Sequence, residues 1–468
     1  MSNRMNYLMK NTGILTISNF SSKILVFLLV PLYTSVLTTE EYGTYDLIIS
    51  TVTLVYPVIT LNIADAVMRF SMDRNYDKKK VASIGFRYIV ISFFLVLVFA
   101  VIMKNIHIVN DWSNLLLYIV LYYISYALNQ YFIQLAKGLE RVSDMAVAGV
   151  ISTITMLGGN ILLLLAFKMR LEGFFLASIL AQIIPAIYFV IRMKFWEILN
   201  FTFDVKLQKE MLLYSVPLIA TVVGWWVNST ADKFVVTFIL GISANGLLSV
   251  SYKIPQIINT LQGIFVQAWQ ISAIKEYGER DTAKFYGNTF TIVNLLMCIA
   301  CSLLVFLTKP LAHILYAKDF YVAWQFVPFL LISSVLNCAS GLLGPILSAQ
   351  KNSKAMMWSA LIGSVSNIIM NIVLVKFIGI QGATVATLLC SYIIYAVRKK
   401  AVGKEIEIDR YPIILLTWGL LFVQAIVENY LSNYMIEAIV MVILFAINIH
   451  PIKKLFGMGR NMVKRIRK

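Results

Sequence analysis

The chain consists of long apolar runs separated by short charged segments. Runs of about 20 mostly uncharged residues, the length that crosses roughly 30 Å of hydrocarbon as an α-helix, recur throughout the sequence. This pattern predicts an all-α integral membrane protein with about 14 transmembrane helices and little chain left for a soluble domain. The predicted spans are centred near Val26, Tyr56, Phe94, Tyr122, Thr155, Ile184, Val227, Ile258, Met297, Leu336, Ile368, Leu388, Leu420 and Val442.

Composition and charge support this interpretation and add an orientation. Hydrophobic residues make up 59% of the chain, charged residues make up 13%, and the mean hydropathy is +0.79, which is far more apolar than a soluble domain. Most of the 40 lysines and arginines fall in alternate loops, on the side that also holds both termini. The positive-inside rule therefore predicts that both termini are cytoplasmic. Topology and anionic inner-leaflet lipid then explain the net charge of +17, which gives no support to nucleic-acid binding.

Segments six predicted spans apart resemble each other. The turn LTTEEYGTYDL resembles LGISANGLLSV, with Gly43 matching Gly246, and the segment NILLLLAFKMRLEG from Asn160 resembles NIVLVKFIGIQG from Asn371. Because an even number of spans preserves the chain direction, the repeats are parallel, as in transporters built from two related bundles. We predict an N-lobe at 1–200, an amphipathic linker at 201–212, a C-lobe at 213–400, and two extra helices with a basic cytoplasmic tail at 401–468.

Polar and small residues follow one face of several predicted spans. In the second and eighth spans they recur every three or four residues, so each helix turns one wettable face away from lipid. Such stripes can serve helix packing alone, whereas charged side chains and glutamines at bilayer depth usually face a cavity or a partner. The candidate cavity residues are Asn19, Lys23, Asp65, Arg69, Asn228, Asp232, Lys233, Lys253, Gln256 and Gln267.

The charges among these residues indicate an anionic ligand. Lys23 lies near mid-membrane, and Lys233 and Lys253 lie at similar depths nearer the outer boundary. Asp232 can pair with either Lys233 or Lys253, and in both cases one cation remains to be neutralised. The three lysines would form a cationic chamber suited to a phosphate or pyrophosphate group. The sequence leaves open which of Asp232 and Lys233 faces the cavity.

Other ionisable residues have simpler interpretations. Asp65 and Arg69 have the spacing of an i, i+4 pair at the cytoplasmic end of the second span. Glu428 and Glu437 lie beside the last outer loop, and we expect them at the membrane interface. No metal or cofactor motif is apparent, since the one C-x-x-C pair falls inside a predicted span, where cysteine is usually a small apolar residue.

Three stretches carry a resemblance to a known family. They are NTGILTISNFSSKILVFLLVPLYTSVLTTEEYGTYDL, FDVKLQKEMLLYSVPL and ADKFVVTFILGISANGLLSVSYKIPQI. Together they resemble bacterial polysaccharide biosynthesis or O-antigen flippases (the Wzx or polysaccharide transporter family), which are MATE/MurJ-like members of the MOP superfamily. The resemblance extends over essentially the whole chain. It implies two six-helix lobes around a central cavity, and Asp232 and Lys233 match the family's A-D-[RK] pattern.

The resemblance also implies a function. It implies a flippase in the bacterial cytoplasmic (inner) membrane that moves an undecaprenyl-pyrophosphate-linked oligosaccharide to the outer leaflet by alternating access, for O-antigen, capsule or exopolysaccharide biosynthesis. The basic cavity residues would then meet the pyrophosphate. We expect no enzymatic activity and no cofactor, and the expected partners are the lipid-linked substrate, membrane lipid, and polysaccharide polymerase and chain-length proteins.

Two alternatives stay open. A MATE-like ion-coupled exporter of small amphiphilic molecules needs a carboxylate deep in the membrane, and the sequence offers chiefly Asp65 and Asp232. A membrane glycosyltransferase or polymerase generally needs a sizeable outer loop with active-site acids or histidines, whereas the outer loops predicted here are short.

Overall fold

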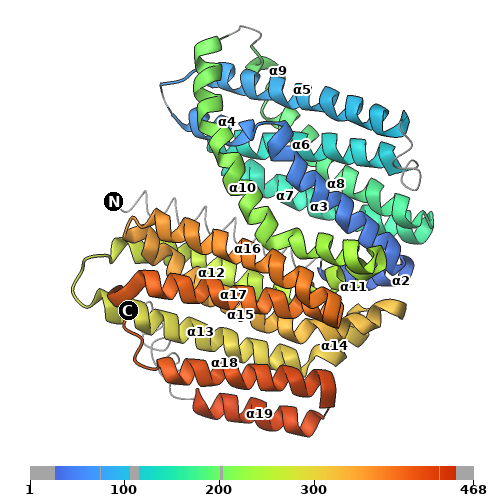
Figure 1. Cartoon of the computed structure of the whole chain (residues 1–468). Coiled ribbons are helices and arrows are strands. Elements are labelled where there is room, and N and C mark those ends of the chain that lie inside the picture. Colours follow the sequence, from blue (N-terminus) through green and yellow to red (C-terminus); the bar gives the residue numbers. More distant parts are fainter. Residues whose placement is uncertain (1–26, 74, 106–114, 201–203, 432, 449–468) are drawn as a thin grey trace, which may run out of the picture. The chain divides into compact units, whose positions relative to one another are not determined.

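The computed structural model describes residues 27–73, 75–105, 115–200, 204–431 and 433–448, and the regular elements in these ranges are all helices (Figure 1). The predicted all-α fold is therefore confirmed. Within the described ranges, 10 helices are long and apolar enough to cross a membrane, or 11 spans if a helix pair bent by 60° counts as one. The chain is a multi-pass membrane protein, and the count of about 14 spans stays a prediction.

Contacts within the chain divide it into two units, Met1–Trp226 and Val227–Lys468. The division falls inside α10 (Val205–Leu240), a continuous helix of 36 residues, and the last part of the predicted linker forms its first turns. The start of α10 is fixed within the first unit, where Lys80 and Asp204 form an ion pair at 3.1 Å. The predicted lobe boundaries stay a prediction.

The first unit packs its helices around an aromatic core. Contacts join α4 to α5 and α6, α6 to α8, and α7 to α8. Tyr131 of α6 is fully buried in this core, and its hydroxyl donates to the Ala82 carbonyl of α5 at 2.7 Å. The elements before α10 are α2 (Val30–Val36), α3 (Thr39–Ile59), α4 (Ile63–Met72), α5 (Lys78–Asn105), α6 (Leu116–Gly138), α7 (Val142–Asn160), the π-helix η2 (Ile161–Ala166), α8 (Arg170–Arg192) and α9 (Phe195–Ile198).

In the second unit, α15 is the central helix. In the most apolar part of its span, 89% of the residues are buried, and the helix contacts α12, α13, α17 and α18. The elements after α10 are α11 (Ile242–Ser251), α12 (Pro255–Lys275), α13 (Thr282–Phe306), α14 (Thr308–Leu315), the 3-10 helix η3 (Lys318–Phe326), α15 (Val327–Ala349), α16 (Ser353–Ile378), α17 (Ile380–Val402), the 3-10 helix η4 (Gly403–Glu405), α18 (Tyr411–Ile426), the π-helix η5 (Val427–Leu431) and α19 (Tyr434–Ile447).

Two helical segments are interrupted, and each interruption lies near a proline. The break between α3 and α4 bends the chain by 60°, and Leu61 and Asn62 adopt positive φ there. Pro57 lies inside the last turn of α3, and it has no backbone N–H with which to continue the helical pattern. In the second unit, a turn at 252–254 separates α11 from α12, which begins at Pro255. These are the second and eighth predicted spans.

The matched sequence segments have the same local role in each unit. Asn160 and Asn371 are fully buried, and each donates from its side chain to the carbonyl four residues earlier, at 2.6 and 2.8 Å. Gly382 allows α17 to approach the backbone of α16 closely, because an added Cβ would lie 2.3 Å from the Leu374 carbonyl oxygen. Gly173, the counterpart of Gly382, similarly packs against the end of the helix before it, with Leu163 O at 3.3 Å from an added Cβ.

The last helices are attached to α13 of the second unit. The Gln424 side chain of α18 accepts from the Ser302 hydroxyl at 2.8 Å and donates to the Ser302 carbonyl at 3.0 Å. The Trp418 indole donates to Asn294 at 3.1 Å. The segment before α18 also lies directly against α13. A Cβ added to Gly287 of α13 would lie 1.6 Å from the Glu407 carbonyl oxygen of that segment. Side-chain bonds and close backbone packing thus hold α18 to α13.

Candidate functional site

Asp232 is buried in the second unit, with 4% of its surface exposed. Its carboxylate on α10 accepts hydrogen bonds from the Tyr252 hydroxyl and from the backbone N–H of Lys233, the latter at 2.9 Å. Tyr252 is the first residue of the turn between α11 and α12, so the interruption of this segment brings its hydroxyl to the acid. Sequence analysis did not identify this donor, because the apolar pattern continues through the turn.

Two predicted cations belong to the same region of the second unit. Lys233 follows Asp232 on α10, Lys253 follows Tyr252 in the turn, and both lysines are half-buried. The helix α12 begins two residues after Lys253, and its first N–H groups bond to the preceding turn, since the Gln256 N–H donates to the Tyr252 carbonyl at 3.1 Å. The region therefore places two lysines close to a buried acid, and charged side chains at bilayer depth usually face a cavity or a partner. The predicted pairing of Asp232 with one of the lysines stays a prediction.

The remaining predicted residues of the second unit have different surroundings. Asn228 is half-buried one turn before Asp232, and its Oδ1 lies 3.9 Å from the Cys390 thiol of α17. Gln256 is exposed. The position of the Gln267 side chain is outside what the structure describes, as are Asn19 and Lys23 in the N-terminal segment. The predicted role of Lys23 in the cationic chamber stays a prediction.

The predicted pair of Asp65 and Arg69 in the first unit is wrong. The Asp65 carboxylate accepts from the Asn62 side chain at 2.8 Å and from the Gln134 side chain of α6 at 2.7 Å. Arg69 instead pairs with Asp73 at 3.7 Å, and 53% of its side chain is exposed. The break before α4 is the reason, because it places an amide donor from the interrupted turn beside the acid.

Arg398 is a buried cation that is not among the predicted cavity residues. It lies in the last turns of α17 and is 7% exposed. Its guanidinium donates to the Ser359 hydroxyl of α16 at 3.1 Å and to the Ser340 carbonyl of α15 at 3.0 Å. Neither partner is charged, and the ion pairs found among the described residues do not include Arg398. A buried guanidinium with neutral partners retains its attraction for an anion.

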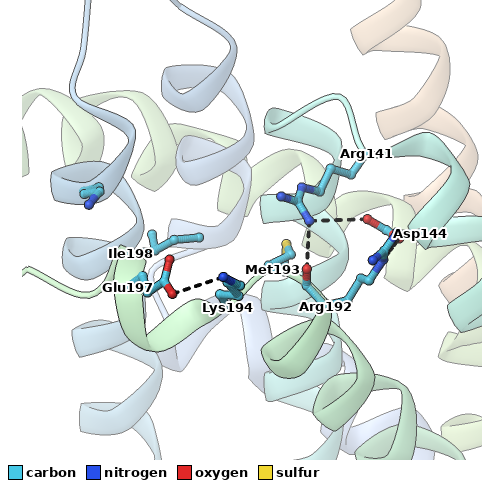
Figure 2. Close-up of a pocket in the computed structure, with 8 residues that line it drawn as sticks. Arg141, Asp144, Arg192, Met193, Lys194, Glu197 and Ile198 are labelled. Atoms are coloured by element: carbon cyan, nitrogen blue, oxygen red, sulfur yellow. Dashed lines mark hydrogen bonds and ion pairs between the residues drawn. The ribbon is translucent and has the colours of Figure 1, made fainter.

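A basic pocket of about 530 Å³ lies in the first unit, at loop ends predicted to face the cytoplasm. Figure 2 shows Arg141 and Arg192 both directed at Asp144, with N···O distances of 3.5 and 3.2 Å. Lys194 faces Glu197 at 3.4 Å. The lining has more cations than acids, so it can attract an anionic group. The lining residues are Lys79, Arg141, Asp144, Arg192, Met193, Lys194, Glu197 and Ile198.

Several membrane-crossing helices, two interrupted segments and buried ionisable groups are together typical of a membrane transporter. Residues 8–270 match the family described as polysaccharide biosynthesis protein, and residues 217–373 match the MatE family. The first match covers more than half of the chain. The chain belongs to the polysaccharide biosynthesis protein family. No curated protein matches it by sequence.

Solved structures show the same fold. The chain is similar to the lipid II flippase MurJ in an inward closed conformation, with a TM-score of 0.65 and 17% identity over 94% of this chain and 99% of MurJ. It is similar to an inward-facing multidrug resistance MATE transporter of the MOP superfamily, with a TM-score of 0.60 and 11% identity over 83% of this chain and 98% of that one. A MOP superfamily transporter from Pyrococcus furiosus has a TM-score of 0.57 at 12% identity over 85% of this chain and 96% of that one. The predicted family is therefore confirmed by the family match, and these structures show that the chain has the predicted MATE/MurJ-like fold.

Proposed function

We propose that the protein is a flippase that moves an undecaprenyl-pyrophosphate-linked oligosaccharide from the cytoplasmic to the outer leaflet by alternating access. The observation that carries this proposal is the match to the polysaccharide biosynthesis protein family in a chain with the MOP superfamily fold. The lipid II flippase MurJ, which has this fold, acts on a lipid-linked substrate, and this supports a substrate of the same kind here. We place the protein in the bacterial inner membrane with both termini in the cytoplasm, where polysaccharide polymerase and chain-length proteins would act after it.

The cations of the second unit support an anionic substrate group. Lys233 and Lys253 lie beside the Asp232–Tyr252 pair, and a lysine ammonium can follow a moving phosphate because its stem is flexible. Lys23 of the first span would complete the chamber. In this proposal Asp232 orients the surrounding donors, while the ammonium groups contact the pyrophosphate.

A second candidate is an ion-coupled exporter of small amphiphilic molecules. The match of residues 217–373 to the MatE family includes Asp232, a buried carboxylate of the kind that such a mechanism needs. The two lysines beside it favour anionic cargo over a cationic amphiphile. The transporter fold of the structural relatives favours transport over the glycosyltransferase or polymerase alternative.

Leaflet exchange in proteoliposomes tests the proposal. A fluorescent undecaprenyl-pyrophosphate oligosaccharide would be reconstituted with the protein, and a membrane-impermeant quencher would report the fraction in the outer leaflet over time. We expect Lys233→Ala and Lys253→Ala each to slow exchange at least tenfold, because hydrogen bonds to charged groups contribute about 1.5–3 kcal/mol and 1.4 kcal/mol corresponds to a factor of ten. Lys206→Ala, which changes an exposed lysine near the start of the same helix, is the matched control.

One result would overturn the proposed flippase function, and a second would overturn only the role of the lysines. The first is an absence of exchange by the wild-type protein together with ion-driven efflux of an amphiphilic dye that Asp232→Asn abolishes, which would identify an exporter. The second is exchange at the wild-type rate in both Lys233→Ala and Lys253→Ala, which would remove the lysines from the mechanism.

A further inference from the structure

Two glutamates and one lysine are enclosed beside the last two helices of the second unit. Glu428 of η5 and Glu437 of α19 are both 0% exposed, contrary to the expected interfacial position. Lys309 of α14 lies with its Nζ 3.4 Å from Glu428 Oε2, and only 14% of the lysine side chain is exposed. The lysine also lies over the rings of Trp324 and Tyr434, at 4.5 and 5.6 Å from their centroids. The aromatic rings and the packing exclude water from this cluster.

The charges of this cluster do not balance if both glutamates are ionised. One ammonium group can neutralise one carboxylate, and Lys309 contacts Glu428. Neither side-chain oxygen of Glu437 has a hydrogen-bond partner among the described residues, although both are buried. The two acids come from elements in contact, η5 and α19, and Lys309 lies against both Glu428 and the ring of Tyr434, which is one turn from Glu437. Two carboxylates have no proton to share, so a hydrogen bond between them requires that one is protonated.

The start of α19 does not stabilise a charge on Glu437. A helix N-terminus normally favours an acid in its first turn because its backbone N–H groups have no helical partner. In α19 the Asn433 side chain caps the helix and accepts from the N–H groups of Met435 and Ile436, at 3.0 and 3.3 Å. The first-turn donors that could have stabilised the glutamate are therefore already used.

We propose that Glu428 and Glu437 form a proton-binding site in which the two carboxyl groups share one proton at neutral pH. Glu437 donates its O–H to Glu428, and Glu428 retains the negative charge that faces Lys309. One proton, one ammonium group and two carboxyl groups then form a cluster with no net charge. Loss of the proton to water leaves one excess negative charge in an apolar enclosure. This buried charge destabilises the packing of α19 against the rest of the second unit.

The other ionisable groups around the pair do not replace the proton. Tyr434 at the start of α19 lies against Lys309, 5.6 Å from its Nζ, and Tyr321 of η3 lies near Tyr434. The Tyr321 hydroxyl is hydrogen-bonded to Nε2 of His313 of α14 at 3.1 Å. Neither tyrosine supplies a positive charge. No group of three or more His, Cys, Asp or Glu side chains in the described part of the chain is arranged to hold a metal ion.

Infrared spectroscopy of the full-length protein in nanodiscs tests the proton directly. At pH 7 the wild-type spectrum should contain the carbonyl stretch of a buried protonated carboxyl group, and this band should be absent from Glu437→Gln, in which an amide occupies the place of the protonated acid. Glu279→Gln, which changes an exposed loop glutamate, should retain the band. Glu428→Gln provides a second variant, since removal of either acid abolishes the sharing. Persistence of the wild-type band in both Glu437→Gln and Glu428→Gln would overturn the proposal.

Thermal unfolding gives an independent readout that does not depend on the proposed transport function. The wild-type midpoint should fall by several degrees as the pH is raised from 7 to 9, because the folded state then loses the shared proton. The midpoint of Glu437→Gln should change much less over the same interval. Restoration of the wild-type midpoint at pH 9 by sodium, and not by choline, would show that the site takes a metal cation and would overturn the assignment of a proton.

Discussion

Replacement of Tyr252 by Phe removes one hydroxyl group and leaves the ring in place. The lost hydroxyl is a donor to the Asp232 carboxylate, which is only 4% exposed, so water cannot readily take its place. Hydrogen bonds to charged groups contribute about 1.5–3 kcal/mol, and we expect Tyr252→Phe to destabilise the second unit by about 2 kcal/mol. For a unit of this size, this corresponds to a fall of roughly 4–8 °C in the unfolding midpoint.

A double-mutant cycle with Asp232→Asn isolates the contact from the general effects of each substitution. Unfolding midpoints and leaflet exchange would be measured for both single variants and for the double variant. We expect a coupling energy of about 1.5–3 kcal/mol. Tyr277→Phe, which removes an exposed hydroxyl, is the control. Additivity of the two substitutions within about 0.5 kcal/mol would refute the argument that the tyrosine holds the acid in place.

Three further predictions follow from other parts of the structure. Gly382→Ala should destabilise the protein by about 1–3 kcal/mol, because its Cβ would lie 2.3 Å from the backbone of α16, whereas Gly419→Ala, with nothing within 4 Å, should not; equal unfolding midpoints would contradict this. The N–H of Leu207 and the Lys80 ammonium lower the pKa of Asp204, so its contribution to stability is present above the ordinary carboxyl pKa of about 4 and is lost as the pH falls through the lowered value. In acid, the unfolding midpoint of Asp204→Asn should therefore fall less than that of the wild type, and parallel curves would contradict this. Arg398→Met should leave the unfolding midpoint unchanged or higher, because it removes a buried charge with neutral partners, but it should slow leaflet exchange; unaltered exchange would exclude a role in anion transport.

The all-α fold and the membrane location could be predicted from the sequence because both depend on local properties. Long apolar runs need lipid, and lipid requires that the backbone satisfy its own hydrogen bonds, so helices follow directly. The matched pairs of Asn160 with Asn371 and Gly173 with Gly382 also carry local information, since each residue acts within its own helix or against the next one. The family could be inferred from similar stretches for the same reason.

The partners of the buried charges could not be predicted in this way. Asp65 and Arg69 have the spacing of a helical pair, but the break before α4 supplies Asn62 as a nearer donor. Glu428 and Glu437 are close to a predicted loop, which suggested exposure, yet packing against other helices encloses both. The partner of a buried charge depends on which helices pack together and where each helix is interrupted. The periodicity of a single segment gives neither piece of information.

The attachment of α18 to α13 has a mechanical consequence for a transporter. Gln424, Trp418 and the close approach at Gly287 connect the two helices at three levels, so the last helices cannot slide along the second unit without breaking several bonds. In a cycle of alternating access they would move together with the second unit as one rigid body. Any lipid tail lodged against the outer surface of α18 or α19 would then be displaced each time the second unit rotates, which would link motion in the surrounding lipid to the passage of the polar head group.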